Sequence, residues 1–168
     1  MEYKIGLAEE KDANEILNVL LDTYHNMEDN SMFTKRDYLY VNNNIINHKM
    51  IKVNTPDKII ACLSLIEPRY KPNNLGIKLG LSASELEKVM QIESVAVSRL
   101  HRGQGIQSKM INKALEEIDT DKHNIVLAQV HPDNIASKRS FLKNGFNVEK
   151  TVMKDGYNPR NILVRRIT

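Results

Sequence analysis

The sequence predicts an α/β fold with a central mixed sheet, and three observations lead to this class. In the second half of the chain, β-rich runs alternate with helical patterns, which is the arrangement of a crossover unit with parallel strands. In the first half, the turn sequence Asn-Thr-Pro-Asp at 54–57 separates two β-rich runs and predicts an antiparallel hairpin. No repeat or low-complexity linker divides the 168 residues, so we expect one domain over residues 1–168.

The first half is expected to contain two helices before the hairpin and one after it. Asp12 caps a helix with apolar residues at helical spacing, namely Ala13, Ile16, Leu17, Leu20 and Tyr24. A second helix is expected from Thr34 to about Ile45, and the asparagine run at 42–44 predicts its end nearby. A third, short helix is predicted by the capping box at 82–85 and should run through Met90. The expected strands of this half are Tyr3–Leu7, Met50–Val53 and Lys58–Ile66.

The segment between the hairpin and the short helix, residues 67–80, is rich in Pro, Gly and Asn, and we expect it to be an insertion over one end of the sheet. The second half then contains two predicted helices, one from Gln104 to Ile118 and one from Pro132 to Gly145. The expected strands of this half are Ile92–Val97, Ile125–Val130, Phe146–Met153 and Ile162–Ile167.

The composition excludes several classes of protein. A formal charge of +3 and few aromatic residues disfavour a nucleic-acid-binding protein. No run approaches the roughly 18 apolar residues of a membrane span, and no basic stretch followed by an apolar one marks a signal, so we expect no membrane partner and a cytoplasmic location. Cys62 is the only cysteine and lies in an apolar run, which fits a reducing compartment. The histidines lack metal-ligand spacing, so we expect no metal.

The segment from Val95 to Lys109 carries the clearest chemical signal. A strand enters a turn that contains Gly103 and Gly105 and opens directly into a helix, so several backbone N–H groups have no intrahelical partner. Such a turn binds phosphate, and the two glycines allow a close approach of the ligand. The spacing fits neither a P-loop nor a dinucleotide fingerprint, which disfavours a nucleotide triphosphatase and a hydride-transfer enzyme. The residues assigned to this site are Arg102, Gly103, Gln104, Gly105, Ile106, Gln107 and Ser108.

Two motifs of the chain resemble the GNAT superfamily of acyl-CoA-dependent N-acyltransferases. Arg102-x-x-Gly105, preceded by the strand Val95-Ala96-Val97, is similar to the start of the family's pyrophosphate loop, although Gln107 stands where the family has Gly or Ala. The segment 130–146 is similar to the family's strand, Asn, helix and Gly-Phe segment. The order of elements extends the resemblance over nearly the whole chain.

The resemblance implies a mostly antiparallel sheet that splays between its fourth and fifth strands, with flanking helices. The pantetheine arm of acetyl-CoA would enter this opening and pair with the strand that ends at Val97, as an added strand pairs with a sheet edge. The residues implied to bind it are, from the strand, Val95, Ala96 and Val97, and, from the later segment, Asn134, Ser137, Lys138 and Phe141.

Two residues are candidates for the base that deprotonates an amine acceptor. Strict alternation along the strand would place Glu93 on the same face as Val95 and Val97, near the opening. The alternative for Glu93 is a solvated or lysine-paired carboxylate at the end of a strand. His131 has a pKa suited to neutral pH, and its alternative role is to stabilise the turn before Pro132. Phe141 stands where many family members have a tyrosine that protonates the leaving thiolate, so this acid is absent.

The expected function is transfer of an acetyl group from acetyl-CoA to a primary amine, directly within a ternary complex. A non-catalytic acyl-CoA-binding or sensor module of the same fold is the alternative. The acceptor stays open among a small amine, an aminoglycoside, an amino acid and a protein N-terminus, and the protein could be a monomer or a homodimer.

Overall fold

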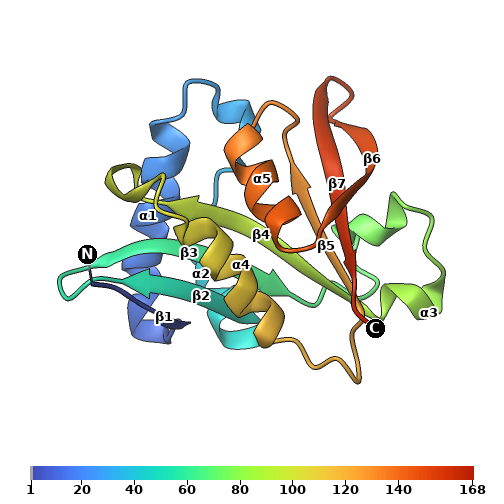
Figure 1. Ribbon diagram of the computed structural model, residues 1–168, viewed down its shortest axis with the longest axis horizontal. Helices are drawn as coiled ribbons and strands as arrows, with labels where there is room; N and C mark the ends of the chain where they lie inside the picture. Colours follow the sequence, from blue (N-terminus) through green and yellow to red (C-terminus); the bar gives the residue numbers. More distant parts are fainter. Residues whose placement is uncertain (1) are drawn as a thin grey trace.

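The structure, a computed structural model, describes residues 2–168, whose strands form one seven-stranded sheet in the order β1-β2-β3-β4-β5-β7-β6 (Figure 1). The β4–β5 pair is parallel and every other pair is antiparallel, which confirms the predicted mixed α/β fold. The strands are β1 Lys4–Leu7, β2 Lys49–Asn54, β3 Ile59–Ile66, β4 Val89–Val97, β5 Ile125–Val130, β6 Asn147–Lys154 and β7 Asn158–Arg166.

Helices cover both faces of the sheet. α4 (Ile106–Glu116) and α5 (Ile135–Lys143) lie on the face nearer the viewer in Figure 1, and α1 (Ala13–His25) and α2 (Tyr38–Asn47) lie behind it. Each layer has a core of its own, because α4 and α5 pack with Ile92 and Val97 whereas α1 and α2 pack with Cys62 and Ala96. Of the described helices, none is long and apolar enough to cross a membrane. The short α3 (Ala83–Leu86) lies beyond one end of the sheet.

The sheet opens between its fourth and fifth strands, as the resemblance implies. β4 and β5 pair only from Val89 opposite Ile125 to Ile92 opposite Ala128, although β4 continues to Val97 and β5 to Val130. Past Ile92 the two strands are no longer hydrogen-bonded to each other. The end of β4 is therefore free to pair with something other than β5.

A β-bulge in β4 corrects the predicted orientation of Glu93. Ser64 of β3 lies opposite Glu93 and Cys62 lies opposite Ala96, so two residues of β4 face Leu63 alone. The bulge includes Ser94, whose φ is +54°, and the extra residue reverses the alternation of side chains beyond it. Glu93 consequently faces the α2 layer, and the expectation that it shares a face with Val95 and Val97 is wrong.

Several predicted boundaries also change. α2 begins at Tyr38 rather than Thr34, because the side chain of Asp37 accepts a hydrogen bond from the N–H of Tyr40 and caps the helix there. The asparagine run lies inside α2 instead of ending it, since Asn44 is buried and bonds Ser64. α5 begins at Ile135 rather than Pro132 because Asn134 is its cap, and α3 stops at Leu86 because β4 already begins at Val89.

Candidate functional site

Two cavities meet at the opening between β4 and β5. We call the first the loop cavity; it is lined by the end of β4, the turn before α4 and the first turns of α5. We call the second the inner cavity; it is lined by the bulge of β4, the ends of β5 and β7 and the segment before α2. The residues that line both are Met32, Phe33, Val95, Asn134 and Ser137. The opening therefore joins two compartments, one on each side of Val95.

The turn before α4 has the backbone conformation that the glycine motif predicts. Gly103 and Gly105 both have φ of +76°, and a Cβ built at either would meet no atom within 4 Å. Gly105 caps α4 without a side chain, so the N–H groups of the first turn, residues 106–108, have neither a side-chain cap nor an intrahelical partner. Arg102 donates from Nε to the carbonyl of Val97 at 3.1 Å and fixes the turn to the end of β4. The turn can accept a phosphate group.

The first turn of α5 forms the opposite wall of the loop cavity. Asn134 caps α5, because its Oδ1 accepts a hydrogen bond from the N–H of Ser137 at 3.3 Å. This bond leaves the two Nδ2 hydrogens of Asn134 for a ligand. Gln107 donates from Nε2 to Oγ of Ser137 at 2.8 Å, so the residue that departs from the family motif ties α4 to α5.

The structure brings some of the predicted cofactor residues together and leaves others outside. Val95, Ala96, Val97, Arg102, Gly103, Gly105, Ile106, Gln107, Asn134 and Ser137 line the loop cavity. Three others line neither cavity, namely Gln104, Ser108 and Lys138. The Ser108 hydroxyl is instead held by Nδ2 of Asn144 at 3.0 Å. Phe141 lines the inner cavity rather than the loop cavity, because it is buried edge-on against Phe146.

Glu93 lies in the inner cavity within a network that reaches α2. One carboxylate oxygen accepts the hydroxyl of Tyr40 at 2.8 Å and is 3.7 Å from a guanidinium nitrogen of Arg36. The other is 3.4 Å from Nε2 of Gln91. The pKa of Tyr40 is raised well above its usual value, mainly by burial and secondly by the charge of Glu93. The hydroxyl therefore stays protonated and donates its hydrogen bond. The bulge contributes to the network, since Oγ of Ser94 bonds both Tyr40 and Arg36.

His131 also lines the inner cavity but is engaged differently. Its Nδ1 accepts a hydrogen bond from the backbone N–H of Asp133 at 3.1 Å. In the neutral ring the proton is then on Nε2, which donates rather than accepts. Of the two candidate bases, only Glu93 presents an unprotonated atom that is not used by the backbone.

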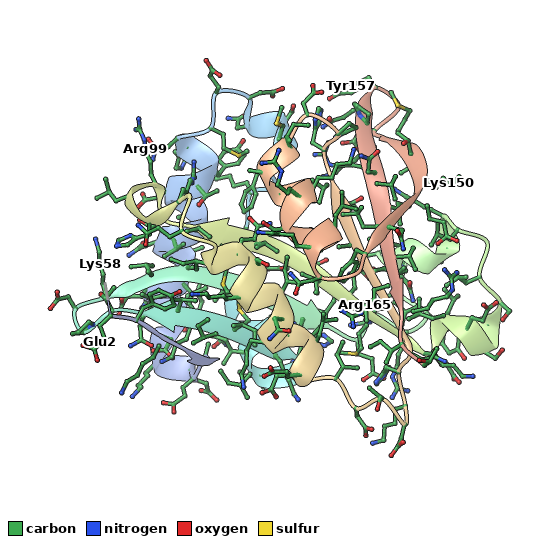
Figure 2. All side chains as sticks on the ribbon, in the orientation of Figure 1. Glu2, Lys58, Arg99, Lys150, Tyr157 and Arg165 are labelled. Carbon is green, nitrogen blue, oxygen red and sulfur yellow. The ribbon has the colours of Figure 1, made fainter. Side chains whose placement is uncertain are left out.

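No motif in the sequence predicted which residues surround Glu93. Arg36 and Tyr40 come from the segment around the start of α2, and Arg160 comes from β7, far from Glu93 in the chain. Tyr157 could replace the missing acid only if its loop folded back over the site, but it is 77% exposed at the tip of the β6–β7 hairpin and lines neither cavity (Figure 2). Within residues 2–168, no cluster of three or more His, Cys, Asp or Glu side chains is placed to hold a metal ion.

The model of the acetyltransferase (GNAT) family matches residues 13–146. The chain belongs to this family. Acetyl-CoA is the cosubstrate typical of this family of acetyltransferases. No curated protein sequence matches the chain significantly.

Solved structures of GNAT proteins share the fold over almost all of the chain. The yncA protein of Salmonella typhimurium, solved with its cofactor acetyl-CoA, has a TM-score of 0.75 at 14% identity, covering 100% of this chain and 95% of its own. The ribosomal-protein-alanine N-acetyltransferase of Brucella melitensis has a TM-score of 0.74 at 18% identity, covering 98% and 99%. Diaminobutyrate acetyltransferase EctA of Paenibacillus lautus, solved with L-2,4-diaminobutyric acid and coenzyme A, has a TM-score of 0.72 at 17% identity, covering 97% and 94%.

Proposed function

We propose that the protein transfers an acetyl group from acetyl-CoA to a primary amine, directly within a ternary complex. The observation that supports this most is that the loop cavity and the inner cavity share a wall at Val95, Asn134 and Ser137. Two reactants that enter from opposite sides would meet there without an intermediate carrier.

The loop cavity fits acetyl-CoA. The open Cβ positions of Gly103 and Gly105 and the N–H groups of the first turn of α4 suit the pyrophosphate. Beyond Ile92, the end of β4 has no partner strand on the side of β5, so backbone groups of Val95 and Val97 can pair with the amides of the pantetheine arm. When bound, acetyl-CoA supplies a thioester whose carbonyl carbon is the electrophile.

Glu93 is the proposed base for the amine. Deprotonating a lysine-like amine at pH 7 costs about 4–5 kcal/mol, and a carboxylate in the inner cavity provides a positioned acceptor for the proton, directly or through one water. The neutral amine nitrogen then bonds to the carbonyl carbon as the carbon–sulfur bond breaks, and the nitrogen releases its second proton to water to give the neutral amide. The sulfur retains the electron pair and leaves as a thiolate, which needs no protein acid because a thiol of pKa about 8.5 is a fair leaving group.

Cys62 supports direct transfer over a covalent acetyl-enzyme. Its thiol is fully buried in β3, and burial raises its pKa to about 12. A thiol in that state is a poor nucleophile, and it lines neither cavity. We further propose that residues 1–168 act as one domain and that the protein acts in the cytoplasm.

The test is release of the CoA thiol from acetyl-CoA against a panel of primary amines, for the wild type, Glu93→Gln and the exposed control Glu10→Gln. We expect amine-dependent release by the wild type and the control, and a loss in kcat of about 100-fold or more for Glu93→Gln. Tight binding of acetyl-CoA without release against any amine would instead favour a sensor. No binding of acetyl-CoA would overturn the proposal.

A further inference from the structure

Arg160 of β7 has no role in the chemistry proposed above, although it lines the inner cavity. Its side chain is 3% exposed. Gln129 of β5 lies opposite Ile162 of β7, and Arg160 is two residues from Ile162, so Gln129 and Arg160 are diagonal neighbours on one face of the sheet. Both line the cavity that contains Glu93.

Among residues 2–168, no carboxylate forms a direct ion pair with Arg160, although Asp155 and Asp29 act on its charge from a greater distance. Its guanidinium donates to three neutral oxygens: the carbonyl of Ser31 at 2.5 Å, Oδ1 of Asn158 at 2.8 Å and the carbonyl of Pro159 at 2.9 Å. A guanidinium has five N–H donors and stays protonated, so two donors remain. A buried cation without a directly paired counterion is costly and favours binding of an anion.

The carboxylate of Glu93 does not supply that counterion, because it is already paired with Arg36. A further cation lies beside the cavity, since Nζ of Lys154 donates at 3.0 Å to Oγ1 of Thr34, which lines it. The carboxylates of Asp29 and Asp155 act on Arg160 from outside the cavity, whose lining contains the cations Arg36 and Arg160 and one carboxylate, Glu93. A simple cationic amine would be repelled by this field, whereas an amine that also carries an anionic group would not.

An unpartnered acceptor lies next to Arg160. Oε1 of Gln129 is buried and has no hydrogen-bond partner in the described chain. A buried acceptor in this state is rare in proteins and suits an N–H group of a ligand. The guanidinium of Arg160 and the amide oxygen of Gln129 therefore line the cavity as neighbours, and Glu93 lies on the adjacent strand β4.

Building on the proposed acetyl transfer, we propose that the acceptor is an amino acid or a similar small amine with a carboxylate. Arg160 binds the carboxylate through its free donors, and Gln129 and Glu93 face the amine. A guanidinium matches a carboxylate in a planar, two-bond geometry that a lysine cannot reproduce. Arg160 is then the residue that determines the specificity for the acceptor.

The test measures kcat/KM for pairs of acceptors that differ only in the carboxylate: lysine and cadaverine, ornithine and putrescine, histidine and histamine, phenylalanine and phenethylamine. A phosphonate analogue, 1-aminoethylphosphonate beside alanine, distinguishes the two kinds of anion. Each acceptor is assayed by thiol release with the wild type, Arg160→Gln and Arg160→Lys.

Two control variants separate binding of the anion from structural effects. Asn158→Ala removes two hydrogen bonds, the one from Asn158 to Ser31 and the one from Arg160 to Asn158, but keeps the guanidinium and its bond to Ser31. Lys58→Gln removes one positive charge at the exposed β2–β3 turn, away from β7 (Figure 2). If Arg160 only anchors the segment at Ser31, the variants at 158 and 160 should lower kcat/KM for both members of a pair alike.

We expect the wild type to prefer at least one amino acid over its decarboxylated partner. Arg160→Gln should raise KM for that amino acid and so lower its kcat/KM about 30-fold or more. The same variant should change kcat/KM for the decarboxylated amine by less than about twofold. Arg160→Lys should recover only part of the loss. Equal effects on both members of each pair, no acetylation of any amino acid, or a preference for the phosphonate would overturn the proposal. Acetylation only of amines without a carboxylate would contradict the proposed acceptor but agree with the proposed acetyl transfer. Failure to bind acetyl-CoA would contradict both proposals.

Discussion

At the residue scale, the network around Glu93 depends on the hydroxyl of Tyr40, whose pKa is raised by burial so that it stays protonated at neutral pH. Tyr40 donates to Glu93 and also contacts the hydroxyls of Ser64 and Ser94. Tyr40→Phe removes these bonds, and we expect it to lower the free energy of unfolding by about 1–2 kcal/mol and to lower kcat, with binding of acetyl-CoA unchanged. Tyr38→Phe, on the same helix and 43% exposed, is the matched control. Equal effects of the two changes would show that Tyr40 does not position Glu93.

The buried thiol of Cys62 makes stability depend on pH. The pKa of this thiol is about 12 in the folded protein against 9.0 for the free group, so the unfolded chain releases the proton first. Its contribution to stability is complete below pH 9 and is lost as the pH rises, by up to about 1.4 kcal/mol per pH unit. Urea unfolding at pH 8, 9 and 10 should therefore show a shallower decline for Cys62→Ala than for the wild type. Parallel declines would contradict this assignment.

At the scale of elements, the turn before α4 positions the cosubstrate. Gly105 has a positive φ and open space at its Cβ, and Gly156 in the β6–β7 turn has the same two properties but lines neither cavity. Alanine at either position should cost about 1–2 kcal/mol of stability through backbone strain. Only Gly105→Ala should weaken the binding of acetyl-CoA. Isothermal titration of both variants with acetyl-CoA measures this difference in affinity. A similar affinity in the two variants would remove the turn from the binding site.

The elements also show what the sequence could and could not predict. The order of strands and helices and the glycine turn follow from hydrophobic periodicity and local motifs, and the structure confirms them. The bulge in β4 is different, because Ser94 adopts a positive φ without being glycine, and nothing local marks it. For this reason the prediction from regular alternation put Glu93 on the wrong face of the sheet.

At the scale of the whole molecule, the inner cavity is assembled from distant segments. Arg160 bonds the carbonyl of Ser31 from 129 positions away, and Tyr40 reaches Glu93 across 53. Such contacts are set by how α2 and β7 pack around the opening, which a single sequence does not specify. The loop cavity is lined largely by two segments, 95–107 and 133–140, that carry recognisable motifs, whereas the inner cavity is also lined by several distant segments that carry none.

The central claim is that two reactants meet at the opening between β4 and β5 and react directly. The initial rate of thiol release, measured while acetyl-CoA and an accepted amine are both varied, tests this claim most directly. Double-reciprocal plots should give intersecting lines, and Cys62→Ala should give the same pattern, because both substrates must be bound at once. Parallel lines would indicate a covalent acetyl-enzyme and would contradict direct transfer through the shared wall of the two cavities.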